Sequence, residues 1–198
     1  MATLPLRGIR VIEMGFAVAG PFACALLADF GAEVIKIEPP GAGDSMRRMG
    51  PAKDGVGLWW SVAARSKKSV TIDIRHERGQ QLIKDLVARS DVLVENFRPG
   101  VLERYGLGWE QLGAVNPDLI MLRISGFGQT GPLANRPGFG KIGESFSGAT
   151  QLTGPRDGAP LHPGYSLADL TTGLMGAFAV MIALFARQNR DIRGELID

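Results

Sequence analysis

Residues 9–37, IRVIEMGFAVAGPFACALLADFGAEVIKI, decide the fold. The apolar and β-branched residues at 9–14 and 33–37 predict two short strands, and the apolar run at 21–30 between them predicts a helix. A β-α-β unit this short predicts parallel strands with helices against the sheet. Such units bind ligands at the turn between strand and helix, so residues 15–20 are the first candidate site.

This turn does not carry the fingerprint of nicotinamide-binding proteins, G-x-G-x-x-G, because only Gly15 and Gly20 are present. Later apolar and amphipathic runs predict more elements: strands at 69–73, 91–95 and 119–124, and helices at 58–64, 77–89 and 109–115. The sequence therefore predicts an α/β fold, a Rossmann-like open sheet of roughly five parallel strands with flanking helices, ending in a long apolar helix.

Basic residues are frequent in the loops that follow the predicted strands. Because the carboxyl ends of parallel strands share one edge of a sheet, these loops should meet there. Their cations would make a cradle for a polyphosphate: Arg47, Lys53, Arg75, Arg98, Arg104, Arg136 and Lys141. An ordinary solvated surface is an equally open interpretation, and the Gly- and Pro-rich loop at 38–57 is either a mobile segment or a flap.

The segment at 164–187, GYSLADLTTGLMGAFAVMIALFAR, predicts the long apolar helix. Large residues recur in it at steps of three and four and predict one buried stripe: Leu167, Leu170, Leu174, Phe178, Met181, Ile182 and Phe185. Asp169 lies at the start of this helix and is the only acidic residue between Asp157 and Asp191.

The position of Asp169 allows two roles. Ser166 and Asp169 have the spacing of a capping box, and a carboxylate in the first turn gains about 0.3–1 kcal/mol from the helix dipole. Spacing alone favours this capping role. A carboxylate kept ionised at a helix start can also attack an activated carbonyl, which divides one acyl transfer into two easier steps.

Composition is that of an ordinary globular protein, with 45% hydrophobic and 21% charged residues in a chain of 198. The net charge of +2 is too small to indicate a nucleic-acid partner. We expect no membrane partner, because the apolar run at 173–185 is shorter than the roughly 20 residues of a span. Cys24 is the only cysteine, which fits a reducing compartment, and we expect a cytoplasmic protein without a metal site.

Several long blocks resemble one known family. PLRGIRVIEMGFAVAGPFACALLADFGAEVIKIEPPGAGD at 5–44, RSKKSVTIDI at 65–74, DVLVENFRPGVLERYGL at 91–107 and SGFGQTGPLANRPGF at 125–139 are similar, in order and spacing, to class III coenzyme A transferases. That family includes formyl-CoA transferase, carnitine CoA-transferase and bile-acid-inducible F relatives. The resemblance covers essentially the whole chain and depends on several blocks together.

The resemblance implies an enzyme that moves CoA between an acyl-CoA thioester and a carboxylic acid. The family's catalytic aspartate begins a Gly-containing apolar helix, and Asp169 is the matching residue. It would form an aspartyl-acyl anhydride and then an aspartyl-CoA thioester in a pocket that excludes water. The resemblance also implies contacts with CoA at Val18, Ala19, Ile72, Asp73, Ile74, Arg75, Asn96, Phe97, Arg98, Arg104, Arg136 and Lys141. Among them, Arg75 and Arg104 are the foremost candidates for phosphate, since a guanidinium fork suits phosphate oxygens.

Two positions depart from the formyl-CoA-specific members, which have Gln in place of Val18 and Arg in place of Pro39, so a different acyl group is implied. A racemase branch uses a His/Asp pair, but the matching loop after Gly126 contains no His, and only His76 and His162 occur elsewhere. Racemisation of a 2-methylacyl-CoA is therefore an alternative function. A non-catalytic CoA-binding fragment is a third.

Members of that family are about twice as long, have a second, smaller domain and form interlocked dimers. The last residues, RGELID at 193–198, resemble the family's G-R-G-Q-x-I-D strand. We therefore expect 1–198 to be the CoA-binding α/β domain, with 167–198 as a helix and strand that lead towards the part not in this sequence. The expected partners are acyl-CoA, a carboxylic acid, and a second copy or a missing C-terminal half.

Overall fold

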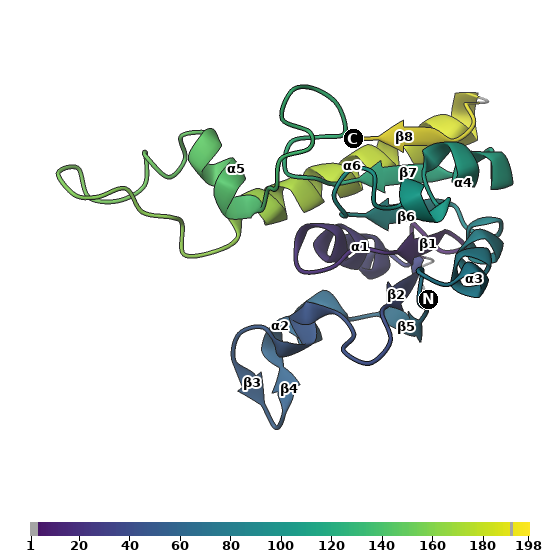
Figure 1. The fold of residues 1–198 in the computed structure, drawn as a ribbon, viewed down its shortest axis with the longest axis horizontal. Helices are drawn as coiled ribbons and strands as arrows, with labels where there is room; N and C mark the ends of the chain where they lie inside the picture. The colour runs from purple at the N-terminus through teal and green to yellow at the C-terminus, as the bar shows by residue number, and fades with distance from the viewer. Residues whose placement is uncertain (1–3, 191) are drawn as a thin grey trace.

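The computed structural model describes residues 4–190 and 192–198. A six-stranded sheet runs through its centre in the order β5-β2-β1-β6-β7-β8 (Figure 1). All neighbouring strands are parallel, so the predicted open α/β sheet is confirmed. In this order the strands are β5 (Lys67–Thr71), β2 (Glu33–Glu38), β1 (Arg10–Glu13), β6 (Val92–Glu95), β7 (Ile120–Arg123) and β8 (Glu195–Ile197).

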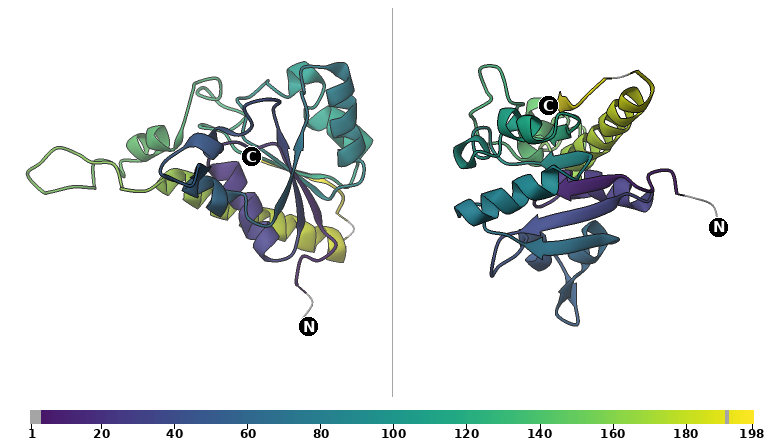
Figure 2. Two further views of the ribbon diagram at one scale, coloured as in Figure 1. Left: turned by 90° about the horizontal axis from the view of Figure 1, so that it is seen from below. Right: turned by 90° about the vertical axis from the view of Figure 1, so that its right-hand side faces the viewer.

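Helices cover both faces of the sheet (Figure 2). One face carries α1 (Ala19–Asp29) and α6 (Leu167–Arg190), and the other carries α3 (Glu77–Val87) and α4 (Trp109–Val115). Successive residues of β1 alternate between the two layers, with Val11 in the core under α1 and α6 and Ile12 in the core under α3 and α4. Both side chains are fully buried, as expected for a strand between two helical layers.

Short elements fill the connections. Residues 38–57 contain the 3-10 turn η1 (Ser45–Arg48) and a small hairpin, and the other short helices precede β5, follow β6 and precede α6: β3 (Ala52–Lys53), β4 (Val56–Gly57), α2 (Leu58–Ala63), η2 (Glu103–Tyr105) and α5 (Gly140–Phe146). After α5, residues 147–166 extend away from the sheet as a long loop before the chain enters α6 (Figure 1).

Strand β5 spans Lys67–Thr71, so the prediction of a strand at 69–73 is wrong by two positions. The reason is a buried lysine. Lys67 Nζ lies 2.6 Å from Glu13 Oε2 and donates to the carbonyl of Pro21 at 2.7 Å, and its side chain is 2% exposed. A hydropathy pattern assigns such a lysine to a loop, because it does not reveal the carboxylate that pairs with it.

The predicted buried stripe of α6 is also wrong. Five of its seven side chains are exposed, among them Leu174 at 54%, Phe178 at 57% and Phe185 at 65%, while Leu167 and Leu170 are half-buried. The buried side carries Leu184 and otherwise only small residues: Gly173, Gly176, Ala177, Val180 and Ala183. A Cβ on Gly173 would lie 2.7 Å from the carbonyl oxygen of Ala19, so glycine lets α6 approach the α1 backbone closely.

By length and composition, α6 could also cross a membrane. The stretch Leu167–Asn189 has a mean hydropathy of 1.8, and 33% of its most apolar window is buried inside the fold. Helix α6 has 24 residues and is longer than the apolar run at 173–185, whose short length is the basis for expecting no membrane partner. It packs against α1 and β7 along its buried side.

Candidate active site

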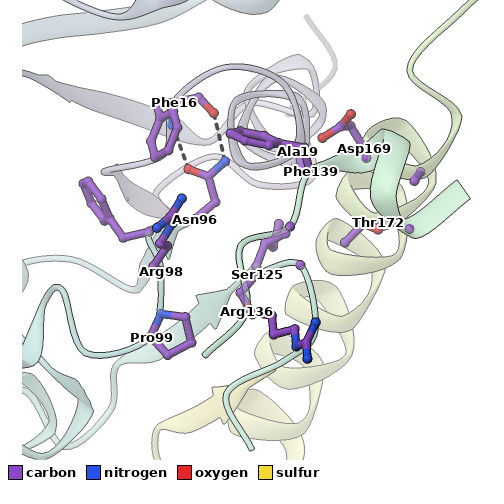
Figure 3. A pocket seen from close by; sticks show the side chains of 17 residues that line it. Phe16, Ala19, Asn96, Arg98, Pro99, Ser125, Arg136, Phe139, Asp169 and Thr172 are labelled. Carbon is purple, nitrogen blue, oxygen red and sulfur yellow. Dashed lines mark hydrogen bonds between the residues drawn. The ribbon is translucent and has the colours of Figure 1, made fainter. Parts of the chain in front are cut away.

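The turn between β1 and α1 is tied to the end of β6 by Asn96. Its Oδ1 accepts from the amide of Phe16 and its Nδ2 donates to the Phe16 carbonyl, both at 2.8 Å (Figure 3). Gly15 and Gly20 lie back to back, since a Cβ on Gly15 would be 3.2 Å from the Gly20 Cα. Ala17, which follows Phe16 in this turn, has a φ of 57°, a left-handed conformation that needs support from its surroundings.

A buried cluster of charged side chains contacts the backbone of this turn. Lys36 Nζ lies 2.7 Å from both Glu13 Oε1 and Asp44 Oδ2, and it donates to the Gly15 carbonyl at 2.8 Å. Asp44 in turn accepts from the amide of Ala17 at 3.3 Å. Burial opposes the charge of Lys36, but Glu13 and Asp44 outweigh it and raise the pKa of Lys36 above its ordinary value. The cluster therefore fixes the turn by ionic contacts that are removed from water.

Two hollows open at the carboxyl edge of the sheet, one on each side of this turn. The first, here called the Asp169 hollow, has a volume of about 170 Å³ and lies between the turn, the ends of β6 and β7, and the start of α6. The second, the Asp73 hollow, has a volume of about 500 Å³ and lies between the ends of β1, β2 and β5. Phe16 and Phe97 line both, with ring centroids 5.7 Å apart.

Asp169 is half-buried in the first turn of α6 and lines its hollow. A Cβ on Gly140 of α5 would lie 2.8 Å from the Asp169 Cγ and closer still to Oδ2, so the missing side chain leaves the space that the carboxylate fills. Burial raises the pKa of Asp169, and the charge of Glu144 raises it further against the opposing charge of Lys141. The group is a carboxylate held at the wall of a hollow, with increased basicity.

The capping-box alternative for Asp169 does not fit the contacts. Within the described residues, no hydrogen bond joins the Asp169 carboxylate to another residue, and none joins the Ser166 side chain to the first turn. Instead, the amide of Ala168 donates to Glu144 Oε1 at 3.4 Å. Glu144, one helix away, satisfies this terminal amide, which leaves the Asp169 carboxylate open to the hollow.

The structure brings most of the predicted site residues to these two hollows. The Asp169 hollow is lined by Ala19, Asn96, Phe97, Arg98, Arg136 and Asp169. The Asp73 hollow is lined by Ile72, Asp73, Ile74, Arg75 and again Phe97. Three predicted residues line neither hollow. Val18 is a nearly buried residue just before α1, Arg104 lies exposed in η2, and Lys141 donates to Glu144 at 3.2 Å.

The predicted cations divide into paired and unpaired groups. Arg47 forms an ion pair with Glu38 and lies 3.7 Å over the ring of Trp60, so it is not free to hold an anion as a flap residue. Arg75 makes a two-pronged pair with Asp73, at 2.9 and 2.7 Å. By contrast, no ion pair among residues 4–190 and 192–198 involves the remaining arginines of the candidate site: Arg98, Arg104 and Arg136.

Sequence reasoning placed Phe16 within its candidate turn at 15–20, but it did not single out several residues that shape the Asp169 hollow. Phe16, Ser125 and Phe139 line it, and Glu144 lies behind Asp169. The Ser125 hydroxyl is buried and has no hydrogen-bond partner. Its place two residues after the end of β7 was a usable signal, because ligands bind at strand carboxyl ends. Glu144 gave no such signal, since it lies in a short helix without a clear apolar period.

Metal ligands and the Cys24 thiol are two further kinds of group that could supply chemistry. In the described part of the chain, no cluster of three or more His, Cys, Asp and Glu residues is placed to hold a metal ion. Cys24 is buried in α1, and burial raises the pKa of its thiol well above the ordinary value. The described side chains that line the Asp169 hollow include a carboxylate, two arginines and an aromatic pair.

Comparison with known proteins defines the class. The profile of CoA-transferase family III matches residues 6–198, and the chain belongs to this family. A solved CAIB/BAIF family protein from Brucella suis superposes with a TM-score of 0.94 at 40% identity, covering 100% of this chain and 53% of that one. A solved protein from M. tuberculosis superposes at 0.87 with 36% identity, covering 98% of this chain and 52% of that one.

Named relatives are CoA-transferases. The chain is 52% identical to a succinyl-CoA–D-citramalate CoA-transferase of Chloroflexus aurantiacus, with 98% of this chain and 48% of the relative covered. It is 43% identical to a succinyl-CoA:glutarate CoA-transferase of Mus musculus, with 98% and 44% covered. The chain thus spans about half the length of the curated relatives that it matches.

Proposed function

We propose that this chain carries the CoA-binding half of an acyl-CoA:carboxylate CoA-transferase, with Asp169 as the nucleophile. The observation that carries the proposal is the environment of the Asp169 carboxylate. It lines a hollow, contacts the Gly140 backbone, and makes no hydrogen bond to another described residue. Burial and the charge of Glu144 raise the pKa of Asp169, and a more basic carboxylate is a better nucleophile in its ionised form.

In the proposed reaction, an Asp169 oxygen attacks the thioester carbonyl carbon, the C–S bond breaks, and CoA leaves as the thiolate. The thiolate then attacks the Asp169 carbonyl of the resulting anhydride, which forms aspartyl-CoA and releases the first acid as a carboxylate. An acceptor carboxylate attacks aspartyl-CoA and gives a new anhydride and the thiolate again. Attack of the thiolate on the acceptor's acyl carbon yields the new acyl-CoA and restores the Asp169 carboxylate.

The two hollows suggest how CoA would lie. We place the nucleotide end in the larger Asp73 hollow, where the lining is largely apolar. The Arg75 side chain at its edge is 71% exposed, and we propose that it exchanges its pair with Asp73 for a phosphate. The pantetheine arm would pass the aromatic pair of Phe16 and Phe97, which lines both hollows. This path delivers the thioester to Asp169. The exposed Arg104 is a second candidate for a phosphate at the outer end.

The acyl group that we propose is a short dicarboxylic one, with succinyl-CoA as the donor. Relatives at 52% and 43% identity are named for succinyl-CoA as a substrate. The site has chemistry for a second carboxylate, because Arg98 and Arg136 line the Asp169 hollow and form no ion pair among the described residues. A guanidinium binds a carboxylate through two parallel hydrogen bonds.

The racemase alternative has no support from the geometry. Both histidines of the chain lie outside the lining of the Asp169 hollow, and His162 faces Glu144 at 3.3 Å. For the rest of the enzyme, we propose that the other half of the family fold, in a second copy or a separate chain, completes the site. The exposed apolar side of α6 is consistent with this, since large exposed apolar faces mark interaction sites.

A transfer assay tests the proposal. The chain, assembled with the other half of the family fold, is incubated with succinyl-CoA and malate, citramalate or glutarate, and new CoA thioesters are separated by chromatography. We expect a new thioester with the wild type and none with Asp169→Asn or Asp169→Ala, while both variants still bind CoA. Undiminished transfer by Asp169→Ala would reject the nucleophile.

A further inference from the structure

We infer that Glu144 is a positioning residue for Asp169, which holds the first turn of α6 and places a second negative charge beside the nucleophile. The inference deepens the proposed function and rests on it for its catalytic meaning. Its structural content stands on contacts from three separate segments, which meet at one buried carboxylate.

Glu144 is a buried residue with contacts to three segments of the chain. The residue is 2% exposed, although it lies in the short helix α5 beside the long exposed loop at 147–166. Its Oε1 accepts from the amide of Ala168, the residue before Asp169. Its Oε2 lies 3.2 Å from Lys141 Nζ and 3.3 Å from His162 Nδ1. One side chain thus joins α5, the loop and the start of α6.

The contacts of Glu144 also determine its charge. Burial alone would raise the pKa of Glu144, but hydrogen bonds from Lys141 and from the Ala168 amide, with the Lys141 charge and His162, lower it below its ordinary value. These contacts favour the ionised form of Glu144. The negative charge of Glu144 raises the pKa of Asp169, so the more open of the two carboxylates becomes more basic.

Helix α5 packs closely against the first turn of α6. Gly140 lies against the Asp169 carboxylate, and a Cβ on Gly143 would be 3.7 Å from the Ala168 Cβ, an ordinary contact. Gly143 and Glu144 follow Gly140 by three and four residues, so each lies on the same side of α5 as Gly140. That side carries the two glycines that allow close approach and the one carboxylate that fixes the approach. The charged groups that face the pair from these elements are Lys141 and His162.

The test uses the Asp169 pKa itself. Side-chain carboxyl ¹³C NMR follows Asp169 through a pH titration, with Asp169→Asn to assign the signal. Glu144→Gln keeps an oxygen for the Ala168 amide and removes the charge, so we expect the Asp169 midpoint to move to lower pH. Lys141→Gln removes the opposing cation and should move the midpoint to higher pH.

The matched control is Glu110→Gln, on the exposed side of α4, which should leave the midpoint in place. A midpoint in folded Glu144→Gln equal to that of the control overturns the inference, as does an unmoved midpoint in Lys141→Gln. As a second readout, Glu144→Ala should slow formation of a covalent adduct on Asp169 by up to about 100-fold, the range of a misplaced reacting group. Failure of the proposed function would appear separately, as no adduct on the wild type while the titration still shifts.

Discussion

The carboxylate of Asp169 lies against the backbone of Gly140, so closely that a Cβ on Gly140 would be 2.8 Å from the Asp169 Cγ. The proposed nucleophile therefore occupies space that is open only because Gly140, on a neighbouring helix, has no side chain. This relationship joins two segments, α5 and α6, that the long loop at 147–166 separates in sequence. It explains why a glycine lies at the first position of α5.

Replacing that glycine tests the relationship directly. Gly140→Ala should push the Asp169 carboxylate out of its position and slow adduct formation or CoA transfer by up to about 100-fold, because small misplacements of reacting groups are costly. The control is Gly113→Ala in α4, where the nearest atom to a new Cβ is 3.9 Å away. Equal rates in Gly140→Ala and Gly113→Ala would show that the contact has no influence on reactivity.

Asn96 offers a prediction about CoA affinity. Asn96→Ala removes both hydrogen bonds to Phe16 and should loosen the turn that lies between the two hollows. We expect about 1 kcal/mol less free energy of unfolding and weaker CoA binding by calorimetry. Asn116→Ala is a comparison, since its amide also bonds to backbone carbonyls but lies away from the hollows. Loss of stability without any loss of CoA affinity would contradict a role for the turn in binding.

Glu38 gives a prediction about pH. Burial alone would raise its pKa, but hydrogen bonds from Arg47, Ser69 and the amide of Asp44 lower it from 4.5 to about 2. Its pKa is depressed in the folded state, so Glu38 contributes stability above pH 4.5 that is lost as the pH falls towards 2. Because its partner Arg47 is 39% exposed and solvent screens the pair, we expect a contribution of about 1–2 kcal/mol.

The measurement is urea unfolding of the wild type and Glu38→Gln between pH 2 and pH 7. The variant should be less stable at pH 7, and the difference should shrink as the pH falls through the window from about 4.5 to about 2. A difference that stays constant across that window would mean that the ionised form of Glu38 does not stabilise the fold.

The two sides of α6 predict opposite outcomes for substitution. Phe178→Ser, at a position 57% exposed, should change the free energy of unfolding by less than about 0.5 kcal/mol. Gly173→Val should cost about 1–3 kcal/mol or more, because its Cβ would meet the Ala19 carbonyl at 2.7 Å. Thermal and urea unfolding measure both. A larger loss for Phe178→Ser than for Gly173→Val would mean that the helix is turned the other way.

Much of the fold was predictable from local patterns. The unit at 9–37 and the strands at 91–95 and 119–124 are apolar runs bounded by turns, and the structure places β1, β2, β6 and β7 there. The strand at 69–73 was misplaced because Lys67 is buried beside Glu13, a partner distant in sequence. The stripe of α6 was misassigned because a period identifies the faces of a helix but not which of them packs on the core.

The site was predictable in its parts but not in its arrangement. Rules about strand ends and the resemblance to CoA transferases selected Asp169, Asn96 and the arginines, and most of these line the two hollows. Neither source selected Gly140 or Glu144. Both act through contacts with α6 across a long loop, and no local sequence pattern encodes such a contact.

The most direct test of the central claim is the mass of the chain after reaction with succinyl-CoA. The protein is quenched in acid, its intact mass is measured, and peptides are mapped. We predict a covalent CoA or succinyl adduct on the peptide containing Asp169, absent from Asp169→Asn. An adduct on another residue, or an equal adduct on Asp169→Asn, would contradict the assignment of Asp169 as the nucleophile.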